Sequence, residues 1–234
     1  MIIKYAKYLI SSPDYTKCPP PDKPEYAFIG RSNVGKSSLI NMLCNYDKLA
    51  KTSSAPGKTQ MINHFEIFSS LPVKVQERQQ GTTVKTAAKN AAYKPPAAGD
   101  ANSSQWYIVD LPGYGFAKIS QSSRRRWEQM IENYLRKREN LTMVFVLIDS
   151  RHSPQKIDLE FLEQLRKWDV PFSIVFTKTD KESQSIVSKN IKDFFSAMKK
   201  NWQFLPQHFI TSATKKLGRD KILAFIEETN TNQE

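Results

Sequence analysis

A glycine-rich loop most constrains what this chain can fold into. It reads Gly30-Arg31-Ser32-Asn33-Val34-Gly35-Lys36-Ser37 and fits the phosphate-binding pattern G-x-x-x-x-G-K-[ST] at every fixed position. An apolar run at 26–29 precedes it, and the stretch at 38–43 has apolar residues at helical spacing. Strand, loop and helix in this order let backbone N–H groups and a helix N-terminus surround a phosphate chain. We therefore predict a polyphosphate site formed by Gly30, Arg31, Ser32, Asn33, Val34, Gly35, Lys36, Ser37 and Ser38.

Two side chains of this loop have specific expected roles. Lys36 would neutralise the phosphates, and Ser37 would place its hydroxyl on a magnesium ion that bridges the outer ones. A simple glycine turn is the alternative, but it does not explain why lysine and serine follow the second glycine directly. ATPases, nucleotide kinases and GTPases all use this loop, so the base must be read elsewhere in the chain.

The 234 residues carry a formal net charge of +12, and 39% of them are hydrophobic. This length suggests one domain with attachments, or two small domains, with enough apolar residues for a sizeable core. The charge favours a polyanionic partner, nucleic acid above all, although a basic surface without a partner fits the composition equally well. No apolar run approaches the length of a membrane span, and no secretory signal is evident. We therefore expect a cytoplasmic protein without a membrane partner.

Apolar runs alternate with amphipathic stretches along most of the chain. Strands are expected at about 1–9, 26–29, 61–68, 106–109, 143–148, 172–176 and 209–210. Helices are expected from the loop to about 45, at 122–138, and around 157–168, 186–198 and 222–226. The alternation predicts an α/β fold of three layers, with a mostly parallel six-stranded sheet and helices on both faces. We expect residues 1–24 to form an edge strand and a proline-rich strap, and residues 25–234 to form a single nucleotide-binding domain.

Residues 73–105 differ in composition from the rest of the chain. They are rich in Ala, Lys, Gln, Ser and Thr and have few large apolar side chains, which cannot repay the entropy of ordering. We predict a mostly disordered insertion between two strands. Its basic residues outnumber its acidic ones, so contact with RNA is one interpretation. A solvated loop is the other interpretation, and the composition favours it.

Two further motifs are placed to sense the terminal phosphate of a nucleotide. A polar loop at 46–60 contains Thr59, which could offer its hydroxyl to magnesium and its N–H to the γ-phosphate, although an ordinary Ser/Pro/Gly loop is the alternative. Asp110-Leu111-Pro112-Gly113 follows an apolar strand, where the carboxylate can hold a metal-bound water. We predict nucleotide contacts from Gly57, Lys58, Thr59, Asp110, Leu111, Pro112 and Gly113. The predicted magnesium ligands are Ser37, Thr59 and Asp110.

The base is expected to bind where two later strands end. Thr177-Lys178-Thr179-Asp180 follows the strand at 172–176, and Thr211-Ser212-Ala213 follows the one at 209–210. The Asp180 carboxylate can accept both N1–H and the exocyclic amine of guanine, whereas adenine would leave it unpaired. Lys178 would lie along the plane of the base, and the Ala213 N–H could reach the guanine carbonyl. These seven residues therefore predict a guanine site.

The motifs together resemble the EngB family of bacterial ribosome-biogenesis GTPases, within the class that includes TrmE, Era, EngA and the septins. The resemblance rests on GRSNVGKSSLIN at 30–41, PGKTQ at 56–60 and DLPGYGFAK at 110–118, and it covers nearly the whole chain apart from the insertion. It implies GTP binding and hydrolysis, assistance to assembly of the large ribosomal subunit, and a requirement for normal cell division and septation. The implied partner is the large subunit or its rRNA, and we expect a monomer.

Two rival functions stay open on the sequence. A P-loop ATPase or nucleotide kinase is disfavoured by the motif that ends at Asp180. A basic RNA-binding assembly factor with a non-switching nucleotide site is disfavoured because Ser37, Thr59 and Asp110 are all present.

Tyr114 affects the expected mechanism. Many small GTPases follow D-x-x-G with a glutamine that orients the attacking water, and a tyrosine cannot do this in the same way. We expect slow intrinsic hydrolysis that the ribosome accelerates. Asn33 resembles the asparagine by which some related GTPases hold a potassium ion, so potassium is a candidate cofactor beside magnesium. The predicted catalytic residues are Asn33, Lys36, Thr59 and Gly113.

Overall fold

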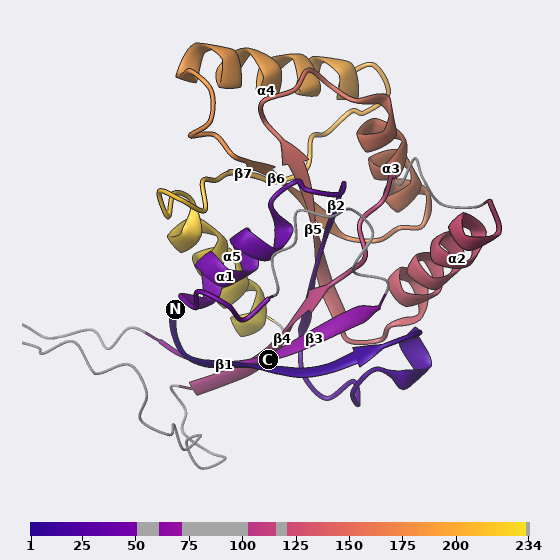
Figure 1. Cartoon of the computed structure of the whole chain (residues 1–234), viewed down its shortest axis with the longest axis vertical. Coiled ribbons are helices and arrows are strands. Elements are labelled where there is room, and N and C mark those ends of the chain that lie inside the picture. Colours follow the sequence, from indigo (N-terminus) through magenta and orange to yellow (C-terminus); the bar gives the residue numbers. More distant parts are fainter. Residues whose placement is uncertain (51–60, 72–102, 116–120, 233–234) are drawn as a thin grey trace, which may run out of the picture.

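One sheet forms the centre of the molecule. The computed structural model describes residues 1–50, 61–71, 103–115 and 121–232, and its sheet has the strand order β1-β3-β4-β2-β5-β6-β7 (Figure 1). The strands are β1 (Ile2–Ser12), β2 (Glu25–Gly30), β3 (Ile62–Ser70), β4 (Ser103–Asp110), β5 (Leu141–Asp149), β6 (Phe172–Thr177) and β7 (His208–Ile210). The pairs from β4 to β7 are parallel, and the two pairs that involve β3 are antiparallel. The mostly parallel α/β fold predicted from the sequence is confirmed.

Within the described residues the sheet has seven strands, one more than the six expected. The additional strand is β1, which pairs with β3 from Ile2, opposite Ser70, to Ser12, opposite Ile62. The N-terminal strand therefore extends the central sheet. A single-turn 3-10 helix, η1 (Tyr15–Lys17), follows it and leads into the proline-rich strap.

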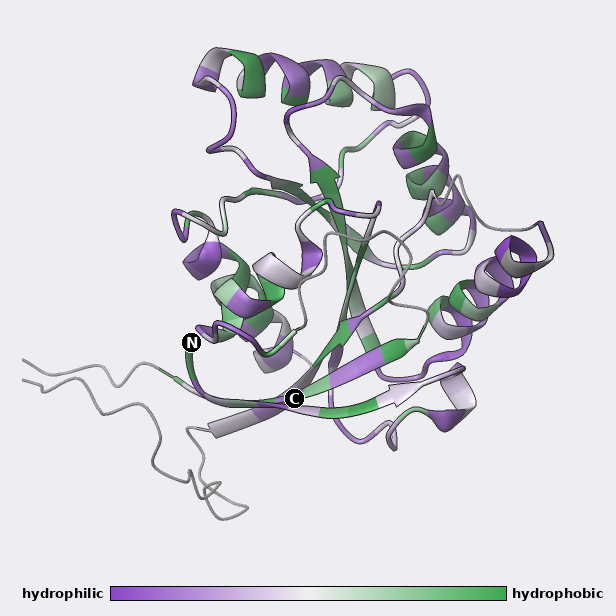
Figure 2. Cartoon of the chain, viewed as in Figure 1, coloured by the Kyte–Doolittle hydropathy of each residue, from purple (hydrophilic) through white to green (hydrophobic). Residues whose placement is uncertain are grey.

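Helices cover both faces of the sheet, as Figure 1 shows. The helices are α1 (Lys36–Cys44), α2 (Gln121–Lys137), α3 (Lys156–Lys167), α4 (Gln184–Met198) and α5 (Arg219–Thr231). The buried apolar residues of α1 and α5 belong to one cluster, and those of α2, α3 and α4, apart from Val187, belong to the other. Apolar residues concentrate in the central strands in Figure 2, as expected for strands that are covered on both sides.

The two central strands, β2 and β5, separate the two clusters. Phe28 and Phe145 stack with ring centroids 4.9 Å apart on the side of α1 and α5. Their neighbours Ala27, Ile29 and Val144 point to the other cluster. Successive strand residues face opposite sides of a sheet, so a continuous apolar run supplies both layers of the core.

The sequence prediction placed the end of the insertion too late. Residues 103–105 belong to β4: Ser103 pairs with Ser70, and Gln105 pairs with Phe68. Ladder hydrogen bonds come from the backbone, so a polar composition does not prevent pairing at the end of a strand. The rest of the predicted insertion, residues 73–102, lies outside the described residues.

A buried carboxylate holds the strap and the C-terminal end of α2 in place. Glu25 is fully buried and accepts two hydrogen bonds from Arg138, at 3.0 and 2.6 Å, and one from the Tyr134 hydroxyl at 2.8 Å. Arg138 also donates to the carbonyl oxygen of Pro19 at 2.7 Å. A buried charge is tolerated where it is paired and hydrogen-bonded in this way.

Candidate functional site

The predicted phosphate loop joins β2 to α1. Strand β2 ends at Gly30, and α1 begins at Lys36, so Ser37 and Ser38 lie in the first helical turn. Gly35 precedes the helix with φ of 106°, and Asn33 has φ of 61°. Glycine adopts such left-handed conformations freely, and asparagine tolerates them better than most residues do. These two residues thus allow the loop to turn sharply before the helix.

The D-x-x-G segment packs directly on this loop. The backbone N–H of Leu111 donates to Phe28 at 3.0 Å, and that of Tyr114 donates to the Gly30 carbonyl oxygen at 3.1 Å. A Cβ atom added to Gly113 would lie 2.6 Å from the Gly30 carbonyl oxygen, closer than any side chain can approach. Only glycine fits there, so the two segments are held in backbone contact.

Lys36 and Asp110 are in contact at the junction of α1 and β4. The Lys36 ammonium forms an ion pair with the Asp110 carboxylate, and the side chains are only 11% and 5% exposed. Burial lowers the pKa of Lys36 to about 7, while the adjacent carboxylate favours the protonated amine. The site therefore holds a lysine that gains from any anion placed nearby.

Lys178, at the end of β6, is tied to the phosphate loop. It has φ of 59°, and its ammonium donates to the Asn33 carbonyl oxygen at 2.5 Å and to the Asp149 carboxylate at 2.9 Å. Its neighbour Thr177 donates its hydroxyl to the Val34 carbonyl oxygen at 2.7 Å. The predicted base-binding and phosphate-binding motifs are thus brought together, although they are far apart in the sequence.

Asp180 is held from the loop that follows β7. The Ser212 hydroxyl donates to Asp180 at 2.7 Å, and this hydrogen bond lowers the pKa of the Asp180 carboxyl. Thr179 donates its hydroxyl to the Thr211 carbonyl oxygen at 3.0 Å. The carboxylate is therefore ionised at neutral pH and fixed relative to both loops.

The cleft beside α1 contains two more of the predicted residues. Ser38 and Ala213 lie on its walls, and its volume is about 300 Å³. Three predicted residues of the polar loop, Gly57, Lys58 and Thr59, lie outside the described residues. Their relation to this site therefore rests on the sequence alone.

One residue of the site was missed from the sequence. Asp149 ends β5, and it accepts hydrogen bonds from Arg151 at 2.9 Å and from Lys178. Burial acts to raise its pKa, but these hydrogen bonds outweigh burial and lower the pKa to about 2. Its position directly after the apolar run at 143–148 was the available signal, because parallel strands place their ligands at this end.

Tyr114 points away from the phosphate loop and into the protein. Its side chain is buried, its ring stacks on Phe161 at 4.4 Å, and its hydroxyl donates to the Asp158 carboxylate at 2.8 Å. Burial raises the pKa of Tyr114 well above its usual value. The tyrosine therefore joins the D-x-x-G segment to α3.

Comparisons with known proteins give the family of this chain. A family model described as a 50S ribosome-binding GTPase matches residues 25–178. Probable GTP-binding proteins EngB from Christiangramia forsetii and Porphyromonas gingivalis are 45% and 46% identical to this chain over 230 residues. These alignments cover 98% of this chain and 98% and 97% of the relatives. The chain belongs to the EngB family. As a member of that family it binds GTP or GDP and is a GTPase, which sets aside the P-loop ATPase and the nucleotide kinase.

Solved structures give the same fold for the EngB family. A crystal structure of a probable GTP-binding protein engB has a TM-score of 0.53 and 21% identity, and the match covers 89% of this chain and 99% of that one. Era from Aquifex aeolicus, bound to GDP and AlF4−, has a TM-score of 0.61 and 20% identity, with 88% of this chain and 56% of Era covered. At this identity the likeness concerns the fold alone.

Neither a gathered set of metal-ligating side chains nor a membrane-spanning helix occurs in the described ranges. Among those residues no three His, Cys, Asp or Glu side chains are gathered where they could hold a metal ion. In the same parts of the chain, no helix combines the length and apolarity that crossing a membrane requires.

Proposed function

We propose that this EngB-family protein is a GTP-driven switch in assembly of the large ribosomal subunit, acting in the cytoplasm, and that normal cell division and septation depend on it. The description of the matching family model, a 50S ribosome-binding GTPase, supports the choice of subunit. The net charge of +12 suits contact with ribosomal RNA. The observation that carries the proposal is the contact of Lys178 with Asn33, because it joins the base-recognition segment to the phosphate loop.

In the proposed mechanism, residues 30–38 bind the phosphates through backbone N–H groups at the start of α1. Lys36 exchanges its contact with Asp110 for one with the phosphates, where its charge has more negative partners. Asp110 is then left as a nearly buried carboxylate without its cation, and such a group favours a new positive charge beside it.

The predicted donor set fits a magnesium ion. Ser37, Thr59 and Asp110 offer only hard oxygen ligands, and few of them, which suits a metal that keeps several waters and phosphate oxygens. When bound, magnesium would neutralise the charge that develops on the phosphates during hydrolysis. Asp110 would hold a metal-bound water, and the two hydroxyls would be direct ligands.

Asp180 selects guanine in this mechanism. Its carboxylate accepts from N1–H and the exocyclic amine, while the Ser212 hydrogen bond holds it in position. Lys178 lies along the base, and the Ala213 N–H reaches the guanine carbonyl oxygen. Adenine cannot supply the two donors, so it would leave the carboxylate unpaired.

Hydrolysis requires groups that stabilise charge around the γ-phosphate. We assign this role to Lys36 and to the backbone N–H groups of Thr59 and Gly113. Asn33 would hold a potassium ion against the phosphates, where the ion supplies the positive charge of an arginine finger. Tyr114 does not orient the water, because its hydroxyl is committed to Asp158. We therefore expect a slow intrinsic rate that increases on the ribosome.

Co-sedimentation with large ribosomal subunits tests the switch. We expect more protein in the pellet with a non-hydrolysable GTP analogue than with GDP, and a steep loss of binding as salt rises. Added subunits should also accelerate phosphate release from GTP. Equal sedimentation with both nucleotides, without faster phosphate release, would instead identify a basic RNA-binding assembly factor with a non-switching site.

A further inference from the structure

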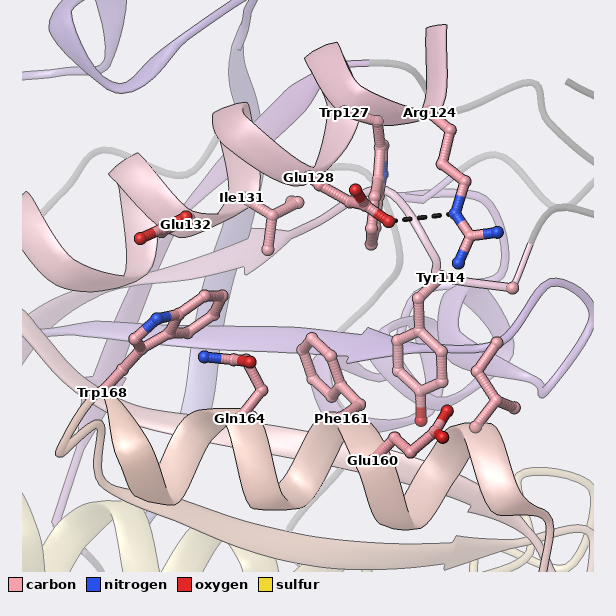
Figure 3. A pocket seen from close by; sticks show the side chains of 12 residues that line it. Tyr114, Arg124, Trp127, Glu128, Ile131, Glu132, Glu160, Phe161, Gln164 and Trp168 are labelled. Carbon is pink, nitrogen blue, oxygen red and sulfur yellow. Dashed lines mark hydrogen bonds and ion pairs between the residues drawn. The ribbon is translucent and has the colours of Figure 1, made fainter. Parts of the chain in front are cut away.

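A groove separates α2 from α3, and Tyr114 and Gly115, which follow the D-x-x-G segment, border it. Its volume is about 450 Å³ (Figure 3). Trp127 and Ile131 point into it from α2, Phe161 and Gln164 from α3, and Trp168 from the position directly after α3. The proposed nucleotide mechanism uses none of these side chains.

The groove combines aromatic walls with an acidic rim. Trp127, Phe161 and Trp168 supply the aromatic surface. Three glutamates, Glu128, Glu132 and Glu160, line it against one arginine, Arg124. Acidic residues therefore outnumber basic ones in this lining, on a chain whose net charge is +12.

The glutamates of the rim are available to a partner. Each of them pairs with a cation four residues away on its own helix: Arg124 with Glu128, Arg136 with Glu132, and Lys156 with Glu160. Glu128 is 50% exposed and Glu160 is 62% exposed. Exposed pairs of this kind contribute little to stability and are readily rearranged.

We propose that this groove binds an arginine or lysine side chain from a basic segment of a partner protein. A guanidinium or ammonium group over an aromatic face gains cation–π energy, and the gain rises as the cation is desolvated. Carboxylates around the same space complete its charge-assisted hydrogen bonds. The lining offers RNA phosphates one cation, Arg124, against three glutamates, which favours a protein partner over a nucleic acid at this surface.

The groove also adjoins the segment that would sense the γ-phosphate. Tyr114 and Gly115 form one of its walls, directly after Gly113. Gly115 has φ of 80°, and a Cβ atom added there would lie 3.1 Å from Ile157 on the opposite helix. A shift of this wall would change the shape of the groove, so nucleotide and partner would affect each other's binding. This coupling, unlike the groove itself, rests on the proposed switch.

The test uses the full chain, saturated with GDP and labelled with ¹⁵N, and a short arginine-rich peptide without tryptophan. The four tryptophans supply an internal comparison, because Trp127 and Trp168 line the groove whereas Trp106 and Trp202 do not. We expect the indole N–H signals of Trp127 and Trp168 to shift on titration and the other two to stay in place. A peptide of the same length with glutamine in place of arginine should leave all four unchanged. Shifts in none of them, or equal shifts in all, would overturn the proposal.

Charge variants separate the groove from general attraction. Glu132→Gln combined with Glu160→Gln should lower the affinity for the arginine peptide about tenfold, from two weakened charged contacts. Glu139→Gln combined with Glu163→Gln changes the net charge equally but lies outside the groove, and should leave the affinity within about twofold. Equal losses of peptide affinity in both double variants would refute the site. All arms are measured with GDP bound, so the outcome does not depend on whether the protein switches with GTP.

Discussion

The ammonium nitrogen of Lys178 lies 2.5 Å from the carbonyl oxygen of Asn33, although 145 positions separate these residues in the sequence. The same ammonium contacts Asp149 at the end of β5. One side chain thereby joins the phosphate loop to the segment that carries Asp180, the residue proposed to recognise the base. We expect nucleotide affinity to depend on this contact, although the proposed mechanism gives Lys178 no phosphate to bind.

Replacing the lysine tests this dependence. Lys178→Met keeps the apolar part of the side chain and removes both hydrogen bonds, so we expect a loss of GDP affinity of about 10- to 100-fold, equivalent to roughly 1.5–3 kcal/mol. Titration with a fluorescent GDP analogue measures it. Lys189→Met, an exposed lysine on α4, is the matched control and should leave GDP affinity unchanged. Similar small losses of GDP affinity in both variants would show that the contact of Lys178 with Asn33 does not support nucleotide binding.

Asp180 should determine the base. In Asp180→Asn the amide can donate as well as accept, so it matches xanthine, which has a carbonyl in place of the guanine amine. We expect weaker GDP binding and stronger xanthosine diphosphate binding than in the parent chain, measured by competition against the fluorescent analogue. Unchanged preference for GDP would show that another group reads the base.

Hydrolysis should depend on the monovalent cation. We expect faster phosphate release in potassium than in sodium buffer, and loss of this difference in Asn33→Gly. Glycine is chosen because Asn33 has φ of 61°, which alanine would adopt only with strain. Equal rates in the two buffers for the parent chain would rule out the potassium role.

Tyr114 should contribute to stability through Asp158. Tyr114→Phe leaves a buried carboxylate without its donor, so we expect the free energy of unfolding to fall by roughly 1–3 kcal/mol. The midpoint of urea denaturation reports this loss. Tyr8→Phe removes an exposed hydroxyl that bonds Ser11, and its effect should stay within about 0.5 kcal/mol. A fully stable Tyr114→Phe variant would mean that the hydrogen bond contributes little.

The low pKa of the Glu25 carboxyl leads us to expect a loss of stability in acid. Burial acts to raise its pKa, but hydrogen bonds from His64 and Arg138 outweigh burial and lower the pKa from 4.5 to about 2. The folded state binds this proton less readily than the unfolded chain does. The resulting stability, of order 3 kcal/mol, is present above pH 4.5 and is lost as the pH falls toward 2.

Urea denaturation of the parent chain and Glu25→Gln checks this linkage. The variant should be less stable at neutral pH, because the amide leaves the Arg138 charge uncompensated. Its stability should also change less between pH 5 and pH 3 (about the range in which the unfolded carboxyl titrates). Parallel pH profiles would assign the acid sensitivity to other carboxyls.

The sequence was most informative where a backbone requirement restricts the residue type. Gly35 and Gly113 were predicted from the motifs, and the structure gives a reason for glycine at both positions: a left-handed turn at Gly35 and a close backbone contact at Gly113. Central strands such as β5 were equally clear, because a strand covered on both faces is apolar throughout. The fold class followed from the alternation of these strands with amphipathic helices.

Contacts between distant residues were not predictable in the same way. Nothing local indicates that Tyr114 pairs with Asp158 or that Asp149 accepts from Lys178, since these pairs form only after the sheet has assembled. The start of β4 was wrong because Ser103 contributes backbone pairing, which its side chain does not reveal. The count of six strands was one too low, although an N-terminal edge strand was expected: β1 lies at the edge of the sheet and pairs with β3.

The Arg138–Glu25 pair has a mechanical consequence for α2. It fixes the C-terminal end of a 17-residue helix to the edge of the core, whereas the N-terminal end follows shortly after the D-x-x-G segment. The C-terminal end of α2 would therefore stay fixed at the buried pair, and motion of the helix would be largest at its N-terminal end. A small tilt about this pair would move Arg124, near the other end of α2, more than residues close to Arg138, and so would change the shape of the groove.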